Sequence, residues 1–248
     1  METRIPIRLE QDPIIESVFE VRFSSSEKEV SELLPGMIFG KLKSKFPKFE
    51  NLPVKQIPKE IRQQDPDLRY RPLVSLQGDS SKVQIGDHLF SLHIKRPYIG
   101  WDEKKKLISI LIDCLKGTGL IETVERFSLK YVNIIPSEPD ADNVFPSLKV
   151  GLQLGDLPVT DQGLHIRSEA SIGGVNVLIN IIPSAYFMED GEKIKGAVLD
   201  VDAIKDLGVG NDLDSILSYL DEVHEIEKTV FFGLLKPETI NKMGPTWE

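Results

Sequence analysis

The sequence has a single cysteine, Cys114, so the chain can form no internal disulfide and no cysteine-based metal site. Its four histidines form no His-x-His, His-Glu-x-x-His or Cys-His pattern, which are motifs of zinc sites. We expect Cys114 to be a buried, unreactive thiol, because it lies beside the apolar stripe of a predicted helix. The residues therefore give no reason to expect a metal or another cofactor.

Phosphate-binding and membrane-spanning motifs are absent as well. Gly208-Val209-Gly210 lacks the third glycine of a dinucleotide fingerprint, and no glycine-rich loop ends in Gly-Lys-Ser or Gly-Lys-Thr. No serine occupies the elbow motif of the α/β-hydrolases. No apolar run approaches the roughly 18–20 residues that a membrane span needs, and residues 1–10 lack a signal-peptide core. We therefore expect a cytoplasmic protein without a membrane segment.

Charge is unevenly distributed along the 248 residues, whose formal net charge is −9. Residues 1–135 hold 22 basic and 19 acidic side chains, a net charge of +3, whereas residues 136–248 hold 8 and 20, a net charge of −12. Phosphate contacts supply most non-specific affinity for nucleic acid, so the acidic second half disfavours wrapping nucleic acid. This argument does not apply to a local basic surface on the first half.

The stretch from 70 to 136 has the clearest pattern. Three short apolar runs are separated by Gly78-Asp79 and Gly86-Asp87, which predicts an antiparallel meander. Asp102 is a suitable N-cap for a helix with an apolar stripe, and period-two alternation returns over residues 121–135. The predicted unit is β-β-β-α-β.

The flanking segments extend this plan. Before it we predict a strand at 14–23, one kinked or two short helices over 24–46, and a long connection at 49–67 with a strand near 52–57. After it we predict four strands, at 148–154, 163–171, 175–182 and 196–204, and a final helix capped by Asn211 or Asp212. The prediction is an α+β protein of mainly antiparallel sheets packed by a few helices. Its two subdomains, 1–136 and 147–248, would be joined near residue 140.

Several short sequence motifs together resemble those of a known family. They are Pro13-Ile14-Ile15-Glu16, Phe19-Glu20-Val21-Arg22-Phe23, Val83-Gln84-Ile85-Gly86-Asp87, Tyr98-Ile99-Gly100-Trp101, and His224 with the downstream Phe232 and Ile240. The family is a sporadically distributed prokaryotic one of about this length, known mainly as uncharacterised. The resemblance implies an accessory protein, as expected of mobile-element or host-defence genes. It supplies no established active site.

One group of residues suggests a binding surface, because it mixes cations with aromatic rings. Such mixtures stack bases and hold phosphates on single-stranded nucleic acid, and they also occur at protein interfaces. The group consists of Arg69, Arg71, Lys95, Arg96, Tyr98 and Trp101. The alternative is that the cations are solvated while the two aromatic rings cover the start of a helix. Our leading hypothesis is a non-enzymatic interaction protein with a protein partner or a second copy, and with nucleic acid as a weaker candidate.

A second group suggests catalysis. Asp200 and Asp202 share one strand face, and His224 lies on or beside the apolar stripe of the last helix. A metal-dependent hydrolase or nuclease would need the three side chains to converge within ~6–8 Å. The alternatives are that the carboxylates line a solvated sheet edge, that Asp202 pairs with a nearby cation, and that His224 is a core histidine with one backbone partner.

Overall fold

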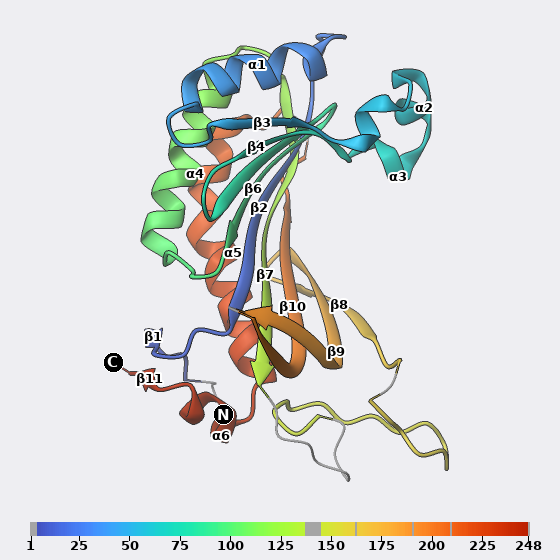
Figure 1. The fold of residues 1–248 in the computed structure, drawn as a ribbon, viewed down its shortest axis with the longest axis vertical. Helices are drawn as coiled ribbons and strands as arrows, with labels where there is room; N and C mark the ends of the chain where they lie inside the picture. The colour runs from blue at the N-terminus through green and yellow to red at the C-terminus, as the bar shows by residue number, and fades with distance from the viewer. Residues whose placement is uncertain (1–3, 137–144, 162, 190, 209, 248) are drawn as a thin grey trace. The chain divides into compact units, whose positions relative to one another are not determined.

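The computed structural model describes residues 4–136, 145–161, 163–189, 191–208 and 210–247 (Figure 1). These residues form an α+β protein with a nine-stranded antiparallel sheet and a two-stranded sheet, which confirms the predicted fold class. In spatial order the larger sheet contains β3 (Lys48–Asn51), β4 (Pro72–Gln77), β5 (Ser81–Gly86), β6 (Leu89–Lys95), β2 (Ile14–Ser24), β7 (Thr123–Pro136), β10 (Glu192–Asp206), β9 (Val175–Glu189) and β8 (Ile166–Ile172). The smaller sheet pairs β1 (Arg8–Leu9) with β11 (Pro245–Thr246).

The helices of the described residues vary widely in length. They are α1 (Val30–Leu42), the 3-10 helix η1 (Pro53–Gln56), α2 (Lys59–Gln64), α3 (Pro66–Arg69), α4 (Trp101–Lys116), α5 (Leu213–Leu234) and α6 (Pro237–Lys242). The chain divides into two compact units. Unit 1 contains Met1–Ile15, Lys130–Ala203 and His224–Glu248, and unit 2 contains Glu16–Leu129 and Ile204–Val223. Each unit combines separate segments, whereas the predicted subdomains are continuous. The predicted linker near residue 140 lies outside the described residues.

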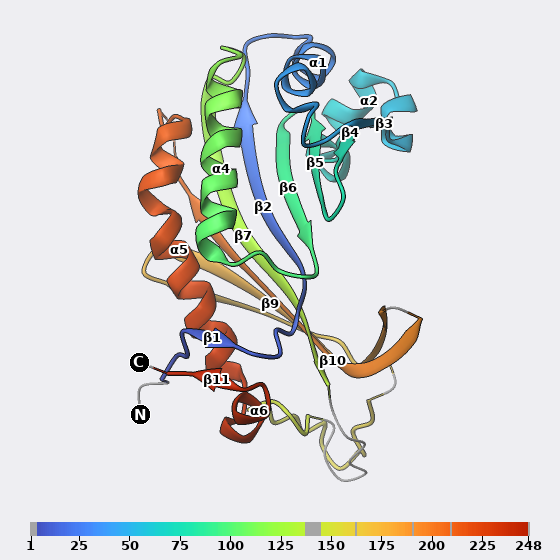
Figure 2. The same cartoon turned by 60° about the vertical axis from the view of Figure 1, so that its left-hand side comes forward.

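Strand β2 shows why the sheet of unit 2 has one apolar and one polar face. Phe19, Val21 and Phe23 are fully buried, whereas Glu20 and Arg22, which alternate with them, are half-buried. Successive side chains of a strand point to opposite faces, so the apolar set forms one surface. In unit 2, α4 runs along β2 (Figure 2), and its apolar stripe is buried. The predicted strand at 14–23 is confirmed.

The predicted meander is also confirmed, because β4 pairs with β5 and β5 pairs with β6, both antiparallel. The helix that follows differs at its start. α4 begins at Trp101 after Gly100, whose φ is 86°, and Asp102 lies in the first turn instead of capping the helix. Glycine adopts this backbone conformation without a Cβ clash, so the glycine sets the boundary. α1 is a single helix that continues through Pro35.

Two predicted segments are wrong. The connection at 49–67 contains β3, η1, α2 and α3, and the strand predicted near 52–57 lies instead at 48–51. Pro53 explains the shift, because proline suits the first turn of a helix and lacks the N–H that a strand would use. The strand predicted at 148–154 is absent, because Leu148 makes only an isolated bridge to Leu235 and Leu154 is exposed.

The remaining second-half predictions hold in outline. β8, β9 and β10 cover the other three predicted strands, and β9 and β10 each extend to 15 residues. Gly173 and Gly174, with φ of 56° and 76°, form the predicted two-residue hairpin turn between β8 and β9. Asp212 accepts hydrogen bonds from the amide and hydroxyl of Ser215 at the start of α5, as its predicted capping role requires.

The end of β5 makes a close contact that a side chain would obstruct. A Cβ added at Gly86 would lie 2.4 Å from the carbonyl oxygen of Arg71. We expect Gly86→Ala to lower the free energy of unfolding by about 1–3 kcal/mol, because backbone must move to admit the methyl group. Urea unfolding at neutral pH measures this change.

The matched control is Gly40→Ala in α1, where a Cβ would meet nothing within 4 Å. This substitution should raise the free energy of unfolding by about 0.5–1 kcal/mol, since alanine loses less backbone entropy in a helix. A Gly86→Ala protein as stable as the Gly40→Ala protein would contradict the packing described at β5.

Candidate functional site

The predicted basic and aromatic residues do not form one cluster. Arg69 and Arg71 lie just before β4. The first residue of β4 pairs with the last residue of β5, so both arginines lie at the end of the meander where β6 begins. Lys95 and Arg96 lie where β6 ends. β6 spans about 20 Å at ~3.3 Å per residue, so its length separates the two pairs.

Trp101 has a role in packing α4 against α5 within unit 2. Its indole Nε1 donates a hydrogen bond to Asp221 over 3.0 Å, and Lys105 contacts the same carboxylate. Tyr98 is half-buried in the connection that precedes α4. Trp101 therefore contacts α5 from the first residue of α4.

Arg69 belongs to a cluster around Tyr70. The guanidinium carbons of Arg22 and Arg69 lie 4.2 Å and 5.3 Å from the centroid of the Tyr70 ring, and the Tyr70 hydroxyl donates to Glu125 over 2.7 Å. Burial raises the pKa of Tyr70, and the hydrogen bond to Glu125 raises it further. Arg69 also pairs with Glu125 at 3.5 Å, so its charge is balanced within the chain.

The predicted catalytic residues lie on two faces of the sheet in unit 1. Asp200 Oδ2 is 2.8 Å from Lys130 Nζ, whereas His224 Nδ1 is 3.4 Å from the Tyr131 hydroxyl. Lys130 and Tyr131 are neighbours in β7, and neighbouring side chains of a strand point to opposite faces. Asp202 is two residues from Asp200 on the same strand, so both carboxylates lie on the face of Lys130, opposite the face that holds His224. The three side chains therefore do not converge. Among the described residues, no group of three acidic, histidine or cysteine side chains is placed to hold a metal.

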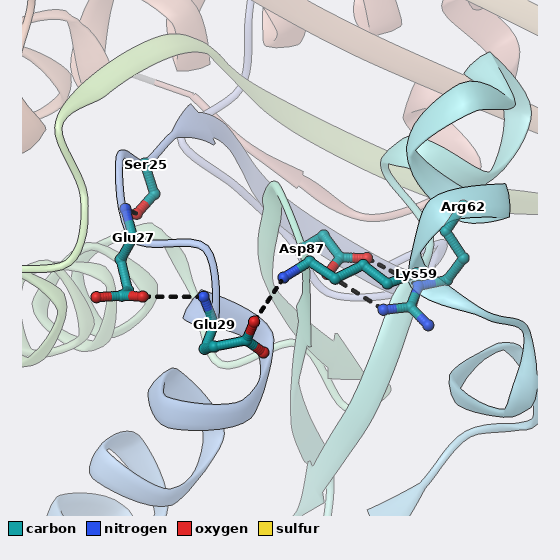
Figure 3. Close-up of polar contacts among 6 residues, drawn as sticks. All are labelled: Ser25, Glu27, Glu29, Lys59, Arg62 and Asp87. Atoms are coloured by element: carbon teal, nitrogen blue, oxygen red, sulfur yellow. Dashed lines mark hydrogen bonds and ion pairs between the residues drawn. The ribbon is translucent and has the colours of Figure 1, made fainter.

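A buried ion pair fixes the segment between β3 and β4. Arg62 Nε lies 2.8 Å from Asp87 Oδ2, and a second guanidinium nitrogen lies 3.3 Å from Oδ1 (Figure 3). The two side chains are only 5% and 3% exposed. Burial by itself would raise the pKa of Asp87, but hydrogen bonds from Arg62 and Ser31 hold it below its ordinary value. The pair connects α2 to the turn between β5 and β6.

Weaker contacts attach the same segment to α1. Lys59 Nζ lies 3.7 Å from Glu29 Oε1, and the carboxylate of Glu27 accepts from the Glu29 amide over 3.0 Å (Figure 3). Ser25 accepts from the Glu27 amide in turn. The segment predicted as a long connection is therefore tied to two neighbouring elements.

The polar face of unit 2 contains a hydrogen-bonded relay that the sequence does not predict. Ser91 Oγ is 3.1 Å from His93 Nε2, and His93 Nδ1 is 2.9 Å from Glu16 Oε1. Ser91 and His93 alternate along β6, and β2 supplies Glu16 from the adjacent strand. The hydrogen bond from His93 lowers the pKa of Glu16, although burial opposes this shift. The only signal in the sequence is that Ser91, His93 and Glu16 occupy the polar positions of two predicted strands.

Strand β8 forms an outer edge of the sheet in unit 1. Six of its seven residues are exposed, and among the described residues β9 is its only partner strand. Arg167 and Glu169 lie on the same face, with their charged groups 3.4 Å apart. An exposed edge strand presents unpaired backbone groups to another strand, so β8 is a candidate interaction surface.

Comparison with models of known protein families found no match to this chain, and no curated protein matches it significantly. Within the described part of the chain, no helix has both the length and the apolar character needed to cross a membrane. The functional assignment therefore rests on the geometry of the molecule.

The buried pair should contribute strongly to the stability of unit 2. We expect Arg62→Ala or Asp87→Ala to lower the free energy of unfolding by about 3–5 kcal/mol, because each leaves an uncompensated buried charge. The double substitution should cost less than the sum of the two. Lys59→Ala, which breaks the partly exposed pair with Glu29, should cost about 1 kcal/mol or less. Additive losses in urea unfolding would show that Arg62 and Asp87 are not coupled.

The same pair predicts a pH dependence. Because the pKa of Asp87 in the folded state lies below the ordinary value of 3.8, its stabilisation is complete above that value. The stabilisation is lost as the pH falls through the folded-state pKa. The difference in free energy of unfolding between the wild-type protein and Asp87→Asn should therefore shrink in acid. A constant difference from neutral pH down to pH values well below 3.8 would contradict the assignment.

Proposed function

We propose that this chain is an interaction protein that assembles through the open edge of β8, and that a second copy of the chain binds there. The observation that carries the proposal is the exposed seven-residue edge strand, whose residue order is complementary to itself. Strand addition at a sheet edge is a common mode of protein recognition. In a twofold arrangement, each copy contributes the same surface.

The hairpin turn determines which backbone groups of β8 are available. Gly173 and Gly174 form a two-residue turn, in which the flanking Ile172 and Val175 exchange hydrogen bonds. Hydrogen bonding to β9 then alternates along the strand, so Arg167 and Glu169 direct their N–H and C=O groups outward. These groups can pair with an approaching strand.

An antiparallel copy centred on Ser168 places complementary side chains opposite one another. Arg167 then faces Glu169 of the second copy, and the same contact occurs twice by symmetry. On the other face of the strand, Ser168 faces its own counterpart, and Ile166 faces Ala170 of the second copy. The small side chains of Ser168 and Ala170 allow close approach, and each oppositely charged pair contributes roughly 0.2–1 kcal/mol.

The polar cluster in unit 2 favours a protein partner over nucleic acid. Arg22 and Arg126 both contact the carboxylate of Glu20, at 2.9 Å and 3.5 Å, and Arg69 pairs with Glu125. Cations that are already paired offer little to a phosphate backbone. The accessory role implied by the family resemblance is part of this proposal.

Charge reversal tests the proposed contact with purified protein. We expect the wild-type chain to dimerise in sedimentation equilibrium, and Arg167→Glu or Glu169→Arg to weaken the dimer by about tenfold or more, because like charges then face each other. The double substitution should restore association, since it exchanges the two signs. Neither change removes a buried contact, because β8 is exposed.

The control for net charge is Lys242→Glu on α6, which makes the same charge change as Arg167→Glu at an exposed position. It should leave the dimerisation constant unchanged. The proposal fails if the wild-type protein is monomeric at every concentration, or if the single and double variants associate equally.

A further inference from the structure

The relay on the polar face of unit 2 has the geometry of an activated serine. We propose that Ser91 is the nucleophile of an acyl-transfer site that hydrolyses small esters, with His93 as its general base and Glu16 as the positioning residue. Nucleophile, base and orienting carboxylate lie in sequence at 3.1 Å and 2.9 Å, within hydrogen-bonding reach at both steps. This inference is independent of the contact proposed at β8, which lies in unit 1.

The hydrogen-bonding partners determine where the protons reside. An ionised carboxylate can only accept, so Glu16 requires that His93 Nδ1 carry a hydrogen. In the neutral imidazole, Nε2 is then the acceptor, and the Ser91 hydroxyl must donate to it. This is the orientation that general-base catalysis needs, because the proton leaves Ser91 toward Nε2 as the nucleophile attacks.

Neighbouring side chains define the rest of the site. On β5, Gln84 lies directly opposite Ser91, and Lys82 lies opposite His93. Directly opposite residues of antiparallel strands have Cβ atoms about 4.5–5.5 Å apart, so the amide of Gln84 can reach an oxyanion formed at Ser91. Lys82 is diagonal to Ser91, at about 7–8 Å, a separation that a long side chain spans. On β2, Glu20 lies opposite Ser91, but its carboxylate is paired with Arg22.

Burial favours a small acyl group. Ser91 is 2% exposed and the His93 side chain 16%, so little water reaches the relay and its hydrogen bonds are strengthened. A substrate reaches Ser91 by displacing the flexible, half-buried side chains of Gln84 and Lys82. An acetyl group is small, so an acetyl ester displaces these two side chains less than an ester with a bulky acyl group does.

The proposed reaction has two balanced steps. Ser91 Oγ forms a bond to the carbonyl carbon of the ester while His93 Nε2 takes the hydroxyl proton. The bond from carbonyl carbon to alkoxy oxygen then breaks, and His93 gives the proton to the departing alcohol. Water next attacks the acyl group on Ser91, passes a proton through His93 to Ser91 Oγ, and releases a carboxylic acid.

Covalent labelling tests the nucleophile directly. The full chain is incubated with a fluorophosphonate probe, and the modified residue is identified by intact-mass measurement and peptide mapping. We expect one label on Ser91 and none in Ser91→Ala. Ser75→Ala is the matched control, because Ser75 is buried on the same face with no hydrogen-bond partner for its hydroxyl within the described residues. It should label like the wild-type protein.

Hydrolysis of p-nitrophenyl acetate tests the other two residues. His93→Gln should abolish the Ser91-dependent rate, whereas Glu16→Gln should lower kcat about tenfold or more with little change in KM, because it disturbs orientation and not binding. Urea unfolding establishes that each variant is folded. Failure of the wild-type protein to label at Ser91, labelling that persists in Ser91→Ala, or full kcat in Glu16→Gln would each overturn the proposal.

Discussion

The alternation of side chains along β2 is the constraint on which unit 2 depends. Phe19, Val21 and Phe23 alternate along the strand and are fully buried, so this face must be covered, and α1 and α4 carry apolar stripes that are buried in the same unit. The other face of the strand carries the charged residues Glu16, Glu20 and Arg22, which need partners. Glu16 bonds to His93 and Glu20 pairs with Arg22, so the second face of the strand is a set of fixed polar contacts.

The same constraint pairs the arginines of the polar face with carboxylates of the chain. A guanidinium on this surface has carboxylates within reach on the neighbouring strand, and Arg126 accordingly contacts Glu20. Deeper in the structure, Arg62 could not be buried unless Asp87 were buried with it. Charge in unit 2 therefore holds elements of the chain in place. Of the two outer strands of the nine-stranded sheet in the described chain, β8 is longer than β3.

Local pattern predicts much of this fold, because β2 and α4 each repeat their apolar residues with a single period, and Gly-Asp pairs separate the apolar runs of the meander. It fails between β3 and β4, where Pro53 and the buried Arg62 override weak local signals with a turn and a tertiary ion pair. The site residues were less predictable still. Arg71 and Arg96 are close to the same predicted meander in sequence, but strand length separates them. Asp200 and His224 are divided by the two faces of the sheet, which composition does not reveal.

The relay at Ser91 shows most clearly which part of a site the sequence alone does not predict. Ser75 and Ser91 are both buried serines on the same face, and Gln84 lies opposite each of them on the strand between. Only Ser91 has a histidine two positions away on its own strand, and only the register of β2 with β6 brings Glu16 to that histidine. A shift of one residue in this pairing would move Glu16 to the other face of the sheet and leave His93 without its carboxylate. The chemistry of Ser91 therefore depends on strand register, which the buried residues Phe19, Val21 and Phe23 enforce from the opposite side.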